Sequence, residues 1–148
     1  MRARPWLPGA VVGLVLLAGC GGSPLSPSEL RDQAGQICRQ MVQQTSSIRR
    51  PRAPSGTAAF LNQGIAVLKP GVEQLRSLDP PNADADTYHR AVQSLSDQVT
   101  NLEQTEREVR RGGDPVGAVQ SLQQRLTPLQ TQADSDWRTL GISACVTR

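Results

Sequence analysis

The 148-residue sequence has few aromatic residues and a single histidine, His89. After Cys20 its aromatic side chains are Phe60, Tyr88 and Trp137, so a core must be built mainly from aliphatic residues. No Cys or His cluster has metal-ligand spacing, and no glycine-rich phosphate loop is present. Hydrolytic enzymes need a base beside a nucleophile, or a metal. We therefore expect no catalytic residue, no metal site and no cofactor, and interpret His89 as a surface residue.

Hydrophobic runs long enough to cross a bilayer are also missing. The apolar stretch at residues 10–18 is too short for about 30 Å of hydrocarbon, which takes roughly 20 apolar residues. It follows a positively charged start, Met1-Arg2-Ala3-Arg4, and this order is typical of an export leader. Loss of Arg2 and Arg4 with the leader would remove two of the positive charges behind the net charge of +3. The charge therefore gives no indication of nucleic-acid binding.

The segment Leu17-Ala18-Gly19-Cys20 resembles the lipobox of bacterial lipoproteins. The resemblance implies cleavage after Gly19, a diacylglyceryl group on the Cys20 thiol, and a lipid anchor at the outer face of the cell membrane. The alternatives are an ordinary signal peptide with a chance cysteine, or an uncleaved anchor helix. We expect a signal peptide at residues 1–19, a lipidated cysteine and flexible tether at 20–26, and a helical domain at 27–148.

Apolar residues recur at steps of three and four in four stretches, which predicts helices at residues 27–48, 57–78, 83–111 and 115–140. Ser26 and Glu29 form a capping-box pattern at the first start, and Asp114 can cap the fourth helix. Gly141 is a candidate left-handed C-cap. No stretch alternates as a strand would. The fold expected is an all-α, antiparallel up-down four-helix bundle.

Two prolines lie inside predicted helices. Pro70 and Pro128 each stand about thirteen residues into their helix, so the second and fourth helices should be kinked at the same height. A bulge there would open a small apolar cavity in the middle of the bundle. The alternative is two tolerated kinks in a filled core. On the third helix, Glu106 interrupts the apolar stripe and should lie close enough to the helix end to reach water.

Once Cys20 is lipidated, Cys38 and Cys145 remain as an even pair in an oxidising compartment. In an up-down bundle, the tail after the fourth helix returns to the first helix, which favours a Cys38–Cys145 disulfide. Closing a loop of about 107 residues stabilises a fold by roughly 4–5 kcal/mol in the chain-entropy model. Two free thiols, or one thiol used for dimerisation, are the alternatives.

The last seventy or so residues resemble small uncharacterised helical lipoproteins of high-GC bacteria. The residues that carry the resemblance are Leu75, Leu78-Asp79-Pro80-Pro81, Tyr88, Gly113-Asp114, Leu140-Gly141-Ile142 and Cys145. The resemblance implies a helical lipoprotein and brings no known activity with it.

Charge should be polarised along the bundle. The end away from the tether is expected to gather Arg49, Arg50, Arg52, Arg110 and Arg111. The end near the membrane is expected to gather Glu29, Asp32, Asp79, Asp84, Asp86, Asp134 and Asp136. The function expected is a non-catalytic lipoprotein that contacts an envelope protein or an acidic wall polymer through the five arginines. A solvated surface without a partner is the plainer interpretation of the charges. The alternative function is a small apolar-ligand-binding module with a mid-bundle cavity.

Overall fold

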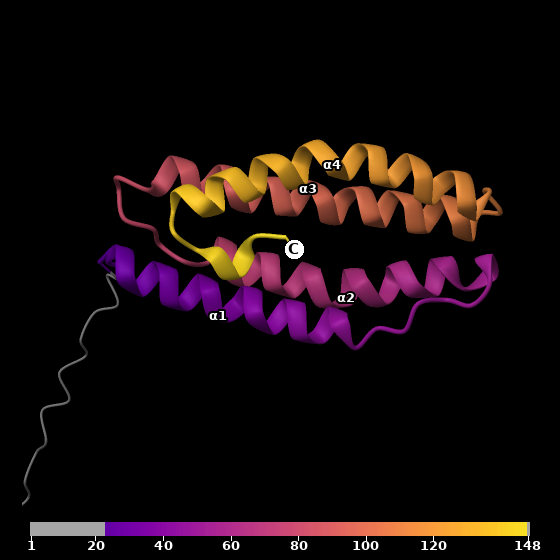
Figure 1. Ribbon diagram of the computed structural model, residues 1–148, viewed down its shortest axis with the longest axis horizontal. Coiled ribbons are helices and arrows are strands. Elements are labelled where there is room, and N and C mark those ends of the chain that lie inside the picture. The colour runs from indigo at the N-terminus through magenta and orange to yellow at the C-terminus, as the bar shows by residue number, and fades with distance from the viewer. Residues whose placement is uncertain (1–22, 148) are drawn as a thin grey trace, which may run out of the picture.

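The computed structural model describes residues 23–147, and the regular secondary structure of this part is all helical, without a strand (Figure 1). Its long helices are α1 Pro27–Ser46, α2 Thr57–Arg76, α3 Ala85–Arg110 and α4 Pro115–Thr139. Two short 3₁₀ helices, η1 Pro54–Gly56 and η2 Ser143–Cys145, lie in the connections. The predicted all-α bundle of four helices is confirmed. Cys20 and the predicted signal peptide lie outside the described residues.

The two predicted helix starts have the expected caps. The Glu29 backbone N–H donates to Ser26 Oγ at 3.3 Å, and the Ser26 N–H donates to the Glu29 carboxylate at 2.8 Å. This reciprocal pair satisfies two amides that α1 leaves without an intrahelical partner. At α4, the Asp114 carboxylate accepts from Val116 and Gly117. Short-range sequence pattern therefore determines where both helices begin.

Glycines in the left-handed conformation end α3 and α4. Gly112 has a φ of 92° and Gly141 a φ of 72°, values that residues with a Cβ rarely adopt. After α4, the Ile142 N–H donates to the Trp137 carbonyl, and the Gly141 N–H donates to the Arg138 carbonyl. These two bonds make a Schellman motif, and Ile142 is turned back into the core. The predicted C-cap at Gly141 is confirmed.

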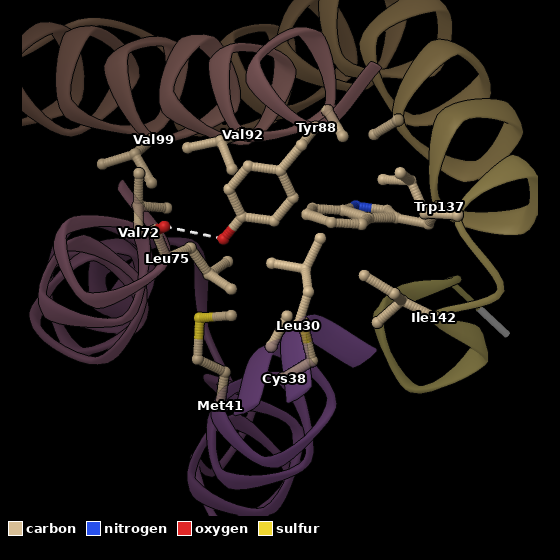
Figure 2. Packing of buried hydrophobic residues seen from close by; sticks show 14 residues of the cluster. Leu30, Cys38, Met41, Val72, Leu75, Tyr88, Val92, Val99, Trp137 and Ile142 are labelled. Carbon is tan, nitrogen blue, oxygen red and sulfur yellow. Dashed lines mark hydrogen bonds between the residues drawn. The ribbon is translucent and has the colours of Figure 1, made fainter. Parts of the chain in front are cut away.

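The main core lies around Tyr88 of α3 and Trp137 of α4, both completely buried (Figure 2). Their rings meet edge to face with centroids 5.8 Å apart. Leu75 of α2, Leu30 of α1 and Ile142 of the tail close the cluster around them. The two aromatics supply the large shared surface, and the aliphatic side chains of the other elements fill the space beside them.

The C-terminal segment joins the two outer helices. Along the row of helices, α1 packs against α2, α2 against α3 and α3 against α4, while η2 packs against both α1 and α4 (Figure 1). Cys145 of η2 is bonded to Cys38 of α1, with their Cα atoms 5.1 Å apart. The predicted disulfide is therefore present, and it holds the tail against α1. The Thr147 N–H also donates to Asp134 of α4 at 2.9 Å.

Helix bounds differ from the prediction by one or two residues at most ends. Helix α2 ends at Arg76, two residues early, and α3 begins at Ala85, two residues late. Both interior prolines, Pro70 and Pro128, lie within single helices and have exposed rings. Within residues 23–147, no helix combines the length and the hydropathy that a bilayer span requires.

Candidate functional site

Three unpaired arginines stand in the connection between α1 and η1, residues 47–53, which we call the basic loop. Arg49, Arg50 and Arg52 are all exposed, and no carboxylate of the described chain forms an ion pair with any of them. The surrounding sequence explains this, because residues 33–72 contain no aspartate or glutamate. The three arginines of the loop therefore present positive charge that no acid of the described chain neutralises.

The other two predicted arginines have different surroundings. Arg110 forms an ion pair with Glu106 at 3.3 Å. Arg111 lines a shallow surface hollow together with Arg107 and Glu108, a hollow that does not include the basic loop. The five arginines therefore have three different environments. Three lie unpaired in the basic loop, Arg110 forms an ion pair, and Arg111 lines a separate hollow.

Glu106 differs from its expected setting. Its side chain is only 9% exposed, and the Arg110 guanidinium lies over it from the following helical turn. The neighbouring Glu103 is bonded to Lys69 of α2 at 2.9 Å and lies 3.9 Å from Arg107. Glu103 and Glu106 are thus both engaged by cations, in part because residues four apart lie on one face of a helix.

A groove of about 350 Å³ opens beside the basic loop. Among the described residues that line it, Arg50 carries the charge. The remainder of the lining is mostly apolar and comes from the end of α1, the basic loop, residues 60–68 of α2 and one residue of α3. The lining residues are Thr45, Ser46, Ile48, Arg50, Phe60, Leu61, Gly64, Leu68 and Leu102.

The groove exists because α1 is displaced toward the end of α2 and stops before it covers the first turns of α2. Leu25, just before α1, bonds to the carbonyl of Asp79, and Met41 of α1 lies against Gly71 of α2. Residues later in α1 therefore contact positions that are nearer the start of α2. Helix α1 ends only five residues after Met41, at Ser46, and the chain then runs along α2 to η1 (Figure 1). The first turns of α2 are left without a helix over this face.

A second hollow of about 210 Å³ lies deeper, between the helices. Its lining residues are Met41, Leu68, Val72, Leu95, Gln98, Val99, Leu102, Leu126 and Gln130. Leu68 and Leu102 line both the groove and this inner hollow. Pro70 lies between two of the α2 lining positions and Pro128 between the two of α4, so the hollow is at the height of the prolines.

Incomplete packing accompanies the hollows. The main cluster reaches Val72 and Val99, and Leu61, Ala118 and Leu122 are buried separately, toward the start of α2 and α4. Five apolar side chains at the edge of the main cluster or between the two regions are only partly covered. They are Ile65, Leu68, Leu95, Leu102 and Leu126. Sequence periodicity marks all five as inward-facing, yet it gives no measure of how well the interior is filled.

One polar cluster was not predicted from the sequence. Arg125 of α4 donates to Asn101 Oδ1 at 3.0 Å and to Thr105 Oγ1 at 2.9 Å, and Thr105 is completely buried. The arginine thus satisfies polar groups between α3 and α4. No sequence signal identifies this cluster, because Arg125 is at least twenty residues away from Asn101 and Thr105 along the chain.

The remaining candidates for chemistry are isolated. His89 is exposed, with its ring centroid 6.1 Å from that of Tyr88. Asp84 makes no side-chain cap at the start of α3. Asp136 is buried and lies 3.3 Å from Arg90. Among residues 23–147, no group of three or more His, Cys, Asp or Glu side chains has a metal-binding arrangement. Comparison with known protein families, characterised proteins and solved structures finds no match for this chain.

Proposed function

We propose that this chain is a membrane-anchored extracytoplasmic lipoprotein without catalytic activity. In this proposal the leader is cleaved after Gly19, and lipid on Cys20 holds the domain at the outer face of the cell membrane. Support comes from the lipobox pattern and from the Cys38–Cys145 disulfide, since disulfides persist mainly in oxidising compartments. The domain then acts by contacting an envelope protein or an acidic wall polymer.

The proposal takes the bundle as antiparallel and up-down, with α2 and α4 kinked at their prolines. Contacts between helices support this order. Lys69 bonds to Glu103 while Arg76, later in α2, bonds to Ser96, earlier in α3. Likewise Arg125 bonds to Asn101, and residue 136 of α4 pairs with residue 90 of α3. In this arrangement the basic loop is remote from the tether, which meets the bundle beside the α2–α3 connection.

The observation that carries the proposed contact is the set of three unpaired arginines in the basic loop. Long-range attraction to an acidic partner depends on net local charge, which ion pairs cancel. Arg49, Arg50 and Arg52 keep their charge, whereas Arg110 is paired with Glu106. The loop is therefore the main contact in this proposal, and Arg111 contributes from its separate hollow.

Crosslinking in intact cells tests the contact. The wild-type chain should yield a specific crosslinked partner, and the triple variant Arg49→Gln, Arg50→Gln, Arg52→Gln should lose most of it. The matched control replaces three exposed arginines elsewhere, Arg31, Arg76 and Arg138, by Gln. Both variants lose the same charge, so an equal loss in both would indicate nonspecific attraction. Unchanged recovery from the loop variant would contradict the proposal.

Mass spectrometry of the native protein tests the anchor. The expected mature chain begins at Cys20 and carries the added mass of a diacylglyceryl group. A chain that retains Met1, or a Cys20 without lipid, would overturn the proposed location.

A second candidate function, binding of a small apolar ligand, is favoured by the inner hollow at the height of Pro70 and Pro128. Its lining is mainly Leu, Val and Met side chains from all four helices. Apolar pockets of this kind are the usual place for small ligands in helical bundles. A ligand that binds only the folded chain should raise its melting temperature in proportion to the logarithm of ligand concentration.

A further inference from the structure

We propose that the groove and the inner hollow together form one binding site for a free, unbranched fatty acid. The aliphatic chain would enter through the groove into the hollow, and the carboxylate would lie at Arg50. This inference rests on the second candidate function and names its ligand class. It requires neither the lipid anchor nor the partner contact of the basic loop.

The apolar part of the site suits a narrow, unbranched chain. Leu68 of α2 and Leu102 of α3 line both cavities, so the groove and the hollow adjoin at these two side chains. The volume of the groove, about 350 Å³, lies at the small end of ligand sites, and the hollow extends it toward the core. In this proposal a single methylene chain occupies both spaces, beside the Leu68 and Leu102 side chains.

The positive charge of Arg50, which lines the groove, favours a ligand with a negatively charged head group. Arg50 lines the groove and makes no ion pair within residues 23–147. The nearest acids along α3 from Leu102 are Glu103 and Glu106, and cations engage both. A carboxylate can therefore bond to the Arg50 guanidinium while the two acids nearest to Leu102 along α3 are already paired with cations. The absence of any acid in residues 33–72 adds to this complementarity.

A second copy of the chain fits the groove less well. Docking a protein takes a broad exposed apolar face. In the described part of the chain, the large hydrophobic side chains left exposed are Val42 and Val116, and neither lines the groove. Its apolar residues face inward around a narrow space, which suits a chain-like small molecule.

The first experiment compares three probes that share a twelve-carbon chain: laurate, dodecanol and dodecyltrimethylammonium. Each is titrated calorimetrically into the full-length chain carrying Cys20→Ser, so that no anchor lipid competes. Laurate and the cation are kept below their micelle concentrations, and dodecanol below its solubility limit. Laurate should bind about tenfold more tightly than dodecanol, as expected for a hydrogen bond to a charged group, and the cation should bind most weakly. Decanoate should bind more weakly than laurate, by about fourfold for each methylene removed.

The outcomes separate the inference from the function on which it rests. If dodecanol or the cation binds as tightly as laurate, the fatty-acid assignment is overturned while the apolar-ligand function stands. If none of the three binds, both are overturned.

Two pairs of variants then locate the site. Arg50→Gln should weaken laurate about tenfold and leave dodecanol unchanged, whereas Arg49→Gln, whose side chain does not line the groove, should leave both unchanged. Gly64 lines the groove, and a Cβ built there has no atom within 4 Å. Gly64→Leu should therefore fill the groove and abolish binding of laurate and dodecanol, while Gly64→Ala retains it. Laurate binding by a folded Gly64→Leu variant at wild-type affinity would overturn the site.

Discussion

The phenol of Tyr88 in α3 donates a hydrogen bond of 2.7 Å to the backbone carbonyl of Leu75 in α2 (Figure 2). Both residues are completely buried. The Leu75 carbonyl also accepts from the Leu78 N–H at 3.2 Å, just after α2. Tyr88 thus joins two helices at the point where one of them ends, and it satisfies its own polar atom inside an aliphatic core.

Replacing Tyr88 by Phe should destabilise the domain by about 1 kcal/mol, the net contribution of a typical hydrogen bond. The ring and its edge-to-face contact with Trp137 are retained in Tyr88→Phe. Urea unfolding followed by far-UV circular dichroism measures the change. No loss of stability would mean that the Leu78 amide alone satisfies the Leu75 carbonyl.

The same residue predicts alkaline instability. Burial raises the pKa of the Tyr88 phenol well above its ordinary value, because the core disfavours the phenolate. In the unfolded chain the phenol ionises near pH 10. Stability from the protonated phenol is therefore complete below about pH 10 and decreases as pH rises above it. The free energy of unfolding should fall between pH 9 and 11 in the wild type and fall less in Tyr88→Phe; parallel pH curves would contradict this assignment.

Two glycines of α2 should respond in opposite directions to alanine. A Cβ on Gly71 would overlap the Met41 thioether, so Gly71→Ala should cost about 1–3 kcal/mol through overpacking. A Cβ on Gly64 meets open space, so Gly64→Ala should stabilise the domain by up to about 1 kcal/mol through helix propensity. Each variant is the control for the other, and thermal unfolding measures both. Equal shifts in melting temperature would contradict the packing described around Gly71.

Removal of the disulfide should cause the largest loss of stability. The double variant Cys38→Ala, Cys145→Ala opens a loop of 107 residues, which corresponds to about 4–5 kcal/mol in the chain-entropy model. The tail that links α1 to α4 would also lose its covalent attachment. Denaturant unfolding of the double variant, with Cys20→Ser as the control, measures the difference. A loss below about 1 kcal/mol would mean that packing of Ile142 alone holds the tail.

Short-range pattern was sufficient to identify the four helices and the caps at three of their ends. The Ser26–Glu29 capping box, the Asp114 cap and the Gly141 C-cap each involve residues a few positions apart, so sequence spacing contains the full interaction. The Cys38–Cys145 bond was predictable for another reason, since few cysteines leave few pairings. Arg125 with Asn101 and Thr105 was not predictable, because the contact joins two helices through their relative rotation.

The candidate site also has parts that the sequence predicts and parts that it does not. Its arginines and its apolar residues were identifiable from spacing, and the prolines indicated the height of the inner hollow. The groove was not foreseen, since it depends on where α1 ends relative to α2. Arg50 was expected in a cluster with Arg110 and Arg111, but it lines an apolar groove while Arg110 is bonded to Glu106.

The sequence by itself determined that this chain is helical, where its helices start and stop, and which face of each is apolar, because these properties depend on neighbours within one or two helical turns. Only the tertiary structure decided how completely those faces are covered. Coverage depends on the relative lengths and positions of separate helices, and α1, ending at Ser46, leaves part of α2 without a neighbour. The same cause exposes the groove beside Arg50 on which the proposed ligand site depends.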